Sequence, residues 1–312
     1  MRTSLISRRH FLGALAAGVA ARPLLGADRA NDNIRLGVML QGASTDDLLA
    51  KAKAIANAGF NLVQLTPFFQ PTADELKSLA AALRELKLKV AAFGTYFNLF
   101  RPDDTGFMRS SVATMKLLAA HTGLFDCKQF ITWSGSYAPK FRGEDPRNHT
   151  PEAVAHLHRA IREVVLPVLE PMDGRVAFEP FYLHVVGSVE LAKEVLAPFP
   201  ASRVGLVLDP PNFISPALYP KREELMRRLF RELGGRVHVV HFKDLKFNPK
   251  TRAVDLPGPG GGEMNYPLFI SEIRKLKRPL PCIIEHIKPD PSELSKTKAW
   301  VETQLDKIER RN

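Results

Sequence analysis

Short apolar runs alternate with helical stretches from residue 34 almost to the C-terminus, and this alternation restricts the possible fold more than any other feature. Ile34–Leu40 is the first run, and the helix predicted over Leu48–Ala58 follows it, with Thr45 and Asp46 as capping residues and Gly59 after its end. Runs of this length suit buried strands, while apolar residues at helical spacing mark the stretches between them. The pattern therefore predicts βα units.

Eight such units can be traced along the chain. The predicted strands are Ile34–Leu40, Phe60–Thr66, Leu88–Tyr96, Phe125–Trp133, Arg175–Phe181, Arg203–Asp209, Arg236–Phe242 and Leu280–Glu285. The predicted helices are Leu48–Ala58, Thr72–Leu86, Phe107–His121, Thr150–Leu169, Val189–Leu196, Lys221–Leu233, Asn265–Leu276 and Ser292–Ile308. Strands that alternate with helices form a parallel sheet, and eight units over about 280 residues fit a single-domain α/β fold, the (β/α)8 TIM barrel.

The alternative fold is an open, doubly wound sheet, which commonly has a glycine-rich phosphate loop after its first strand. The residues after the first predicted strand, Gln41-Gly42-Ala43, do not form such a loop. The stretch Gly258–Glu263 has Glu where the motif G-x-G-x-x-G requires its last Gly. We therefore expect the closed barrel.

Two long irregular stretches interrupt the alternation, Ser134–Thr150 and Lys246–Gly262. A loop as long as the first is usually functional in a compact domain. The second contains most of the glycine-rich stretch, and we interpret Gly258–Glu263 as a mobile loop.

Residues 1–27 are predicted to be a twin-arginine (Tat) signal peptide, with residues 28–312 forming the barrel. Ser7–Leu12 reads S-R-R-H-F-L, and Gly13–Ala21 is a weakly apolar run of small residues. Small residues near Ala27 fit a cleavage site, and a short N-terminal helix is the alternative. The run is too short to span a bilayer. We expect export by the twin-arginine route to the periplasm, without a stable membrane anchor.

The charge of the chain argues against binding to nucleic acid. There are 44 basic and 33 acidic residues, and four of the basic residues and none of the acidic ones lie in the predicted leader. The mature chain would have a net charge of +7, against +11 for the whole chain. No run of five or six like charges occurs, which is typical of an ordinary solvated surface.

The two cysteines, Cys127 and Cys282, fall in predicted strands that would lie far apart in a barrel. Cys282 also has the opposite parity to Glu285 along its strand, so the two side chains point in opposite directions. We expect two buried thiols, neither a disulfide nor part of a metal site.

Four consecutive strands of the second half end on residues that commonly bind metals. They are Glu179 in V-A-F-E-P-F, Asp209 in L-V-L-D-P-P-N-F, His241 in V-H-V-V-H-F-K-D and Glu285 in C-I-I-E-H-I. Each taken alone could be a cap, an ion-pair partner or a core histidine. The carboxyl ends of barrel strands meet at one face, so together they should converge. Three buried carboxylates repel one another without a cation. Three carboxylates and one imidazole suit one divalent metal ion, Mn²⁺ first, with Co²⁺, Mg²⁺ or Zn²⁺ as alternatives.

With these motifs the chain resembles the xylose isomerase-like TIM-barrel superfamily, in particular its sugar phosphate isomerase/epimerase branch. The matching pieces are F-E-P at Glu179, L-D-P-P-N at Asp209, V-H-F-K-D at His241, I-I-E-H at Glu285, and G-G-G-E-M-N-Y before the seventh helix. The resemblance extends over about Ile34 to Ile308. It implies a metal bound by Glu179, Asp209, His241 and Glu285, with Glu179 and Glu285 also moving the proton.

The chain departs from this family at two positions. Many relatives have His three residues after the aspartate of the sixth strand, where this chain has Asn212. Some have a further His in the fifth strand, where this chain has Phe181. These replacements leave the expected metal ligands intact but change the polar substrate contacts that are usual in the family.

The expected chemistry is proton transfer at a carbon beside a sugar carbonyl. A divalent ion that holds both substrate oxygens stabilises the enediolate. Two catalytic carboxylates on opposite faces, Glu179 and Glu285, can remove the proton from one face and return it to the other. We predict a metal-dependent sugar isomerase or epimerase whose partner is a small sugar or keto-sugar, and a homo-oligomer is compatible with this function.

Five further residues near strand ends are predicted to bind substrate: Lys243, His184, Asn212, Trp133 and Tyr96. Lys243 could polarise a carbonyl or hold an anionic group, or it could be a surface lysine paired with Asp244. His184 follows the fifth strand closely enough to touch substrate. Trp133 and Tyr96 could stack on a sugar or could only pack at the rim.

Three other functions compete with this prediction. An AP endonuclease of the same superfamily binds three metals through extra histidines that this chain lacks at the ends of its early strands, and export would separate it from DNA. A lyase or hydratase acting on 3-keto-glycosides would use the same metal and the same proton abstraction, with elimination in place of reprotonation. A non-catalytic sugar-binding barrel is the third.

Overall fold

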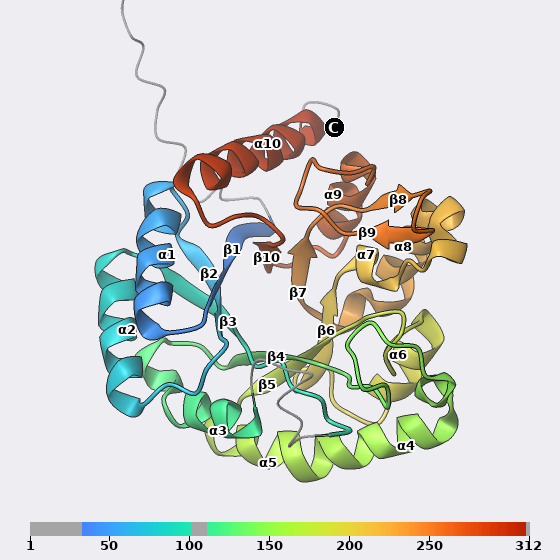
Figure 1. The fold of residues 1–312 in the computed structure, drawn as a ribbon, viewed down its shortest axis with the longest axis horizontal. Coiled ribbons are helices and arrows are strands. Elements are labelled where there is room, and N and C mark those ends of the chain that lie inside the picture. Colours follow the sequence, from blue (N-terminus) through green and yellow to red (C-terminus); the bar gives the residue numbers. More distant parts are fainter. Residues whose placement is uncertain (1–32, 102–110, 310–312) are drawn as a thin grey trace, which may run out of the picture. The chain divides into compact units, whose positions relative to one another are not determined.

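Eight parallel strands close into a barrel in the order β1, β10, β7, β6, β5, β4, β3 and β2, and helices surround it (Figure 1). The structure is a computed structural model that describes residues 33–101 and 111–309. All of these residues belong to one structural unit. The predicted single-domain (β/α)8 barrel is confirmed.

The barrel strands lie within or close to the predicted apolar runs. They are β1 (Ile34–Gly42), β2 (Leu62–Pro67), β3 (Lys89–Gly94), β4 (Gln129–Trp133), β5 (Arg175–Glu179), β6 (Val204–Leu208), β7 (Val237–Phe242) and β10 (Leu280–Ile284). The barrel closes where the first strand meets the last, with Ile34 opposite Leu280 and Val38 opposite Ile284. The predicted metal ligands therefore lie at the same end of four neighbouring strands.

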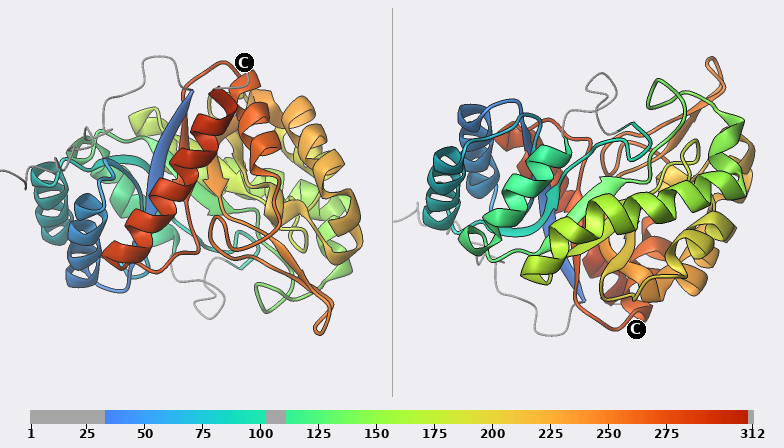
Figure 2. Two further views of the ribbon diagram at one scale, coloured as in Figure 1. Left: turned by 90° about the horizontal axis from the view of Figure 1, so that it is seen from above. Right: turned by 90° about the horizontal axis from the view of Figure 1, so that it is seen from below.

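Helices form the outer layer. They are α1 (Thr45–Asn57), α2 (Ala73–Glu85), α3 (Val112–Ala120), α4 (Pro151–Ala160), α5 (Leu166–Leu169), α6 (Val189–Leu196), α7 (Pro210–Phe213), α8 (Arg222–Leu233), α9 (Tyr266–Lys275) and α10 (Pro291–Glu309). Side-chain caps explain several starts: Thr72 and Glu75 form a capping box at α2, and Thr150 caps α4. The cap of α1 is Ser44, one residue before the predicted Thr45. α10 packs against α1 and α9, and the left view of Figure 2 shows it lying across the outside of the barrel in front of β1.

The helix predicted over Thr150–Leu169 is divided into α4, a π-helical turn at Ile161–Val165, and α5. Pro167 explains the division, because proline has no N–H to donate to the carbonyl four residues earlier. The third helix begins at Val112, and the start predicted at Phe107 lies outside the described residues. The predicted leader, residues 1–27, also lies outside them.

The stretch Lys246–Gly262 is not the featureless loop that was predicted. Its first part forms an antiparallel hairpin of β8 (Lys246–Asn248) and β9 (Ala253–Asp255). The glycine-rich part is held by the buried Asp244, whose carboxylate accepts hydrogen bonds from the backbone N–H groups of Gly260 and Met264 at 3.1 and 2.8 Å. The interpretation of Gly258–Glu263 as a mobile loop is therefore corrected.

Apolar side chains fill the inside of the barrel as well as the layer between barrel and helices. The inner cluster consists of Ala92, Tyr96, Ile131, Ala177, Val207, Val239 and Ile283. Small and branched residues of this kind pack the interior into a solid core, so the space for ligands lies above it at the strand ends. Cys127 and Cys282 are buried free thiols, as predicted. Among the described residues, every helix is too short or too polar to cross a membrane.

Candidate metal centre and substrate cavity

The side chains of Glu179, Asp209, His241 and Glu285 meet at the C-terminal ends of β5, β6, β7 and β10, as predicted. All four are buried, and one possible ligand atom of each lies within 4.8 Å of the others. His241 Nδ1 is 3.6 Å from Glu179 Oε2, 3.6 Å from Glu285 Oε1 and 3.7 Å from Asp209 Oδ2. These separations are too long for hydrogen bonds. They are the separations expected of atoms that each lie about 2.1 Å from one shared ion.

A chain of buried hydrogen bonds orients His241. Its Nε2 lies 3.0 Å from Oε1 of Gln64, and because an amide oxygen only accepts, Nε2 must carry the hydrogen. Gln64 Nε2 donates in turn to Tyr96 Oη at 2.9 Å, and Tyr96 Oη donates to Glu179 Oε2 at 2.7 Å. Nδ1 of a neutral His241 therefore presents its lone pair to the three carboxylates.

Asp209 Oδ1 and His241 Nδ1 are buried without a hydrogen-bond partner, and the buried Asp209 Oδ2 and Glu285 Oε1 are ion-paired with the ammonium group of Lys243. Burial alone would lower the pKa of His241, but the carboxylates of Glu285 and Glu179 outweigh it and raise the pKa well above its ordinary value. The site thus attracts positive charge, and a proton competes with a metal ion for Nδ1. A divalent cation would satisfy the unpaired atoms and offset the carboxylates, so these residues fit a metal ion.

Lys243 is part of the cluster. Lys243 is buried, with 1% of its surface exposed. Its Nζ lies 2.6 Å from both Asp209 Oδ2 and Glu285 Oε1. Burial lowers the pKa of Lys243, but the charges of Asp209 and Glu285 outweigh this and raise the pKa above its ordinary value. The alternative of a surface lysine paired with Asp244 is therefore wrong, since Asp244 binds backbone N–H groups instead.

The two glutamates have different partners. Glu179 accepts hydrogen bonds from neutral groups, Asn212 Nδ2 at 3.0 Å on Oε1 and Tyr96 Oη at 2.7 Å on Oε2. Glu285 has Lys243 at Oε1, while its Oε2 is 3.9 Å from His286 Nε2. Burial raises the pKa of Glu285, but Lys243 and His241 outweigh it and hold the pKa well below its ordinary value. Glu285 is thus held as a carboxylate by charge, and Glu179 is held in place by neutral donors.

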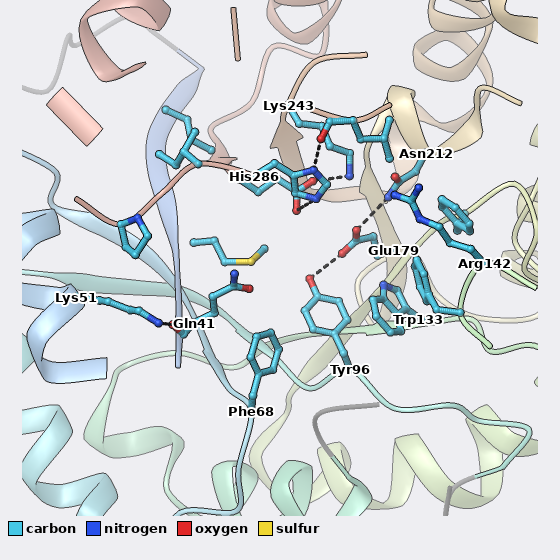
Figure 3. Close-up of a pocket in the computed structure, with 18 residues that line it drawn as sticks. Gln41, Lys51, Phe68, Tyr96, Trp133, Arg142, Glu179, Asn212, Lys243 and His286 are labelled. Carbon is cyan, nitrogen blue, oxygen red and sulfur yellow. Dashed lines mark hydrogen bonds and ion pairs between the residues drawn. The ribbon is translucent and has the colours of Figure 1, made fainter. Parts of the chain in front are cut away.

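A cavity of about 490 Å³ opens above the cluster (Figure 3). Glu179, Glu285, Lys243 and Asn212 line its deep, buried end, and Tyr96 lies next to them. Asp209 and His241 are completely buried and do not line the cavity. Two glutamates thus reach the cavity, while Asp209 and His241 face only the cluster.

The structure places four of the five predicted substrate-binding residues at the cavity: Lys243, Asn212, Trp133 and Tyr96. His184 is the exception and corrects the prediction, because it is completely buried and does not line the cavity. Its Nε2 lies 2.9 Å from the carbonyl oxygen of Phe141, and its ring packs edge-on against Phe141 and Trp133. His184 therefore packs against Phe141 and Trp133, which line the cavity, and supports their rings.

Several residues of the site were not predicted individually. Phe141 and Arg142 come from the long stretch Ser134–Thr150, whose length indicated a function but not which of its residues would face the substrate. Gln64 had a usable signal, because it is a single polar residue in the otherwise apolar run L-V-Q-L. Phe68 follows β2 and lines the cavity near Tyr96 (Figure 3).

A family model described as xylose isomerase-like TIM barrel matches residues 52–309. No curated protein matches the chain in sequence.

Three similar solved structures share the fold. A xylose isomerase domain protein from Planctomyces limnophilus is 17% identical, with a TM-score of 0.67 over 89% of this chain and 98% of that one. An L-ribulose 3-epimerase is 13% identical, with a TM-score of 0.66 over 89% and 96% of the two chains. A 3-keto-D-glucoside 4-epimerase from E. coli is 15% identical, with a TM-score of 0.60 over 86% and 99%.

Proposed function

The chain belongs to the xylose isomerase-like TIM barrel family, and from this premise we propose that it is a divalent-metal-dependent sugar isomerase or epimerase. The observation that carries the proposal is the pair of glutamates. Glu179 and Glu285 both belong to the four-residue cluster and both line the cavity. The two epimerases among the structures of similar fold support the same class of reaction.

The two glutamates can act on opposite faces of a substrate. Glu179 ends β5 and Glu285 follows β10, and β6 and β7 lie between these strands in the barrel. One carboxylate removes a proton from the carbon beside the carbonyl, and the other returns a proton to the other face or to the neighbouring carbon. On Glu285 the proton is accepted at Oε2, because Oε1 is bound to Lys243.

The remaining residues of the cavity orient these groups. Tyr96 and Asn212 each donate to one oxygen of Glu179, which fixes the plane of that carboxylate. The ammonium group of Lys243 lines the deep end and can donate a hydrogen bond to a substrate oxygen. A bound divalent ion, for which we propose Mn²⁺ before Co²⁺, Mg²⁺ or Zn²⁺, would act as a Lewis acid toward charge that develops on substrate oxygens. The residues proposed to hold it are Glu179, Asp209, His241 and Glu285.

The proposal is tested by metal analysis of the purified protein, followed by incubation with ketoses and 3-keto-glycosides in D₂O. We expect one divalent ion per chain and deuterium at a carbon beside the carbonyl. Loss of water or of an aglycone would change the reaction to that of a lyase or hydratase. Glu179→Gln should stop exchange while substrate still binds. If neither the unmodified protein nor this variant exchanged deuterium although both bound the sugar, the protein would be a sugar-binding barrel.

We also propose that the chain is exported through its twin-arginine segment. Arg8 and Arg9 and the small apolar residues after them carry this proposal. Replacing both arginines with lysine should retain the protein in the cytoplasmic fraction, as measured by cell fractionation with a marker for each compartment. Equal export of both proteins would contradict the proposal.

A further inference from the structure

We infer that the substrate is a sugar that carries an apolar, preferably aromatic, substituent, as in an aryl glycoside or its keto form. The inference rests on the proposed function, and it concerns the part of the cavity that the proposed reaction does not use. The deep end is lined by polar groups, Glu179, Glu285, Lys243 and Asn212. The outer part is lined mainly by carbon. Its apolar residues are Met39, Phe68, Trp133, Phe141, Phe181, Leu256, Ile287 and Pro289.

One side of the outer part is an aromatic wall. The ring centroids of Trp133 and Phe141 are 4.1 Å apart, and those of Phe141 and Phe181 are 4.8 Å apart with planes inclined by 28°. His184, packed behind Trp133 and Phe141, supports these rings. A wall that is already packed in this way binds a flat group without the cost of ordering its own side chains.

The opposite side is formed by aliphatic residues that two segments bring together. Leu256 follows β9, and Ile287 follows β10. Gly258 allows the two segments to approach closely, because a Cβ at this position would lie 2.5 Å from Cγ2 of Ile287. The glycine-rich stretch thus gives the outer cavity its second apolar side.

The size of the cavity leaves room for a ligand larger than one sugar ring. About 490 Å³ falls in the range of roughly 300–1,000 Å³ of pockets that enclose drug-sized ligands. The polar groups of the deep end can satisfy the hydroxyl groups of one ring. The lining also includes Gln41, Lys51, Arg142 and His286, but a second sugar would bury the hydroxyl groups that face the aromatic and aliphatic sides against carbon, which is costly. An apolar substituent would lose nothing there and would remove the wall from water.

The charges of the cavity do not favour a phosphate group as this substituent. Lys243 is bound by Asp209 and Glu285, and Lys51 is 2.8 Å from Asp47. Arg142 is a single exposed cation at the rim, with its guanidinium carbon 5.9 Å from the ring centroid of Phe181. A guanidinium group beside an aromatic ring provides a flat surface on which a second ring can stack.

The test measures equilibrium binding by calorimetry to the full chain loaded with Mn²⁺. The probes are matched pairs of phenyl and methyl glycosides in the gluco, galacto and manno series, with glucose and glucose 6-phosphate for comparison. We expect the phenyl member of the preferred series to bind at least about tenfold more tightly than the methyl member. Glucose 6-phosphate should bind no more tightly than glucose.

Two variants relate this difference to the cavity. Ile287→Ala and Leu256→Ala should each weaken the binding of the phenyl glycoside more than that of the methyl glycoside, and so bring the phenyl-to-methyl affinity ratio closer to one. Leu218→Ala is the matched control, because Leu218 is 40% exposed and does not line the cavity. It should leave both affinities unchanged.

Equal binding of phenyl and methyl glycosides would overturn the inference, as would tighter binding of glucose 6-phosphate than of either. So would an affinity ratio that neither cavity variant changes. The proposed reaction is judged separately, by deuterium exchange: a phenyl preference without exchange would support this inference and count against the reaction. Failure of every glycoside to bind would overturn this inference, while deuterium exchange with ketoses would still support the reaction.

Discussion

The two halves of the barrel contribute different kinds of side chain to the site. The half formed by β5, β6, β7 and β10 supplies the charged cluster, with three carboxylates, one imidazole and the ammonium group of Lys243. Among the described residues, the half formed by β1 to β4 supplies neutral groups to this cluster, Gln64 and Tyr96, and aromatic and apolar groups to the cavity above it.

The different side chains of the two halves explain how the site is stabilised. Charged groups concentrated on four neighbouring strands repel one another and require a cation, which Lys243 supplies in part. The other half adds no charge to the cluster itself and instead fixes the direction in which His241 and Glu179 point. We therefore expect substitutions in the charged half to abolish function or stability, and substitutions in the neutral half to weaken affinity by smaller factors.

The largest effect is expected for the proton-transferring carboxylates. Glu285→Gln should lower the rate of deuterium exchange by about 10²–10⁴-fold, because an amide cannot accept the proton. NMR spectroscopy of the recovered sugar measures the rate. Glu232→Gln, a surface glutamate paired with Arg228, is the control and should exchange at the original rate. A Glu285→Gln rate within tenfold of the original would show that this glutamate does not carry the proton.

The next effect is on stability. Lys243→Met should destabilise the metal-free protein by about 3–5 kcal/mol, because it leaves buried carboxylates without their cation. Added Mn²⁺ should restore part of the loss by supplying positive charge at the same place. Urea unfolding with and without metal measures both effects.

The matched control for this substitution is Lys193→Met, which removes a lysine whose ion pair with Glu232 is exposed on the lysine side. It should cost at most about 1 kcal/mol. If both lysine variants lost the same small amount, the idea that Lys243 offsets the charge of the cluster would be wrong.

A smaller effect is expected in the neutral half. Gln64→Leu should weaken metal affinity by about 10–100-fold, because His241 loses the acceptor that sets its orientation. Competition with a chelator measures the dissociation constant without any substrate. Tyr96→Phe keeps the bond between Gln64 and His241 and should weaken affinity less. Equal affinities of Gln64→Leu and the unmodified protein would remove Gln64 from the metal site.

The smallest difference between the halves is expected in the reactivity of their cysteines, which lie away from the cavity. Cys127 on the one side and Cys282 on the other are both buried, and burial raises the pKa of Cys127 to about 12. Both thiols are shielded from solvent, and burial disfavours the reactive thiolate of Cys127, so neither cysteine should react with a thiol reagent until the protein unfolds. Rapid labelling of either one in the native state would contradict this.

Much of the barrel could be predicted because its signals are local. Each strand is a short apolar run and each helix has its own caps and spacing, so the element Val189–Leu196 was predicted with both of its ends. The sequence did not predict the hairpin of β8 and β9, nor the hydrogen bonds by which Asp244 anchors the glycine-rich stretch. The two strands of the hairpin have only three residues each, which is too short to show a strand pattern, and Asp244 contacts Gly260 and Met264 across 16 and 20 positions of sequence.

The sequence by itself determined the barrel and the four metal-competent residues, because parallel strands must bring their carboxyl ends to one face. Only the tertiary structure decided what each of these residues touches. Lys243 turns inward to Asp209 and Glu285, and His184 faces the core instead of the substrate. Gln64 reaches His241 across 177 positions of sequence. Such contacts follow from the closure of the barrel, which places side chains from β2 beside those from β7. The residue pattern of a single strand does not indicate which side chains of other strands it will contact.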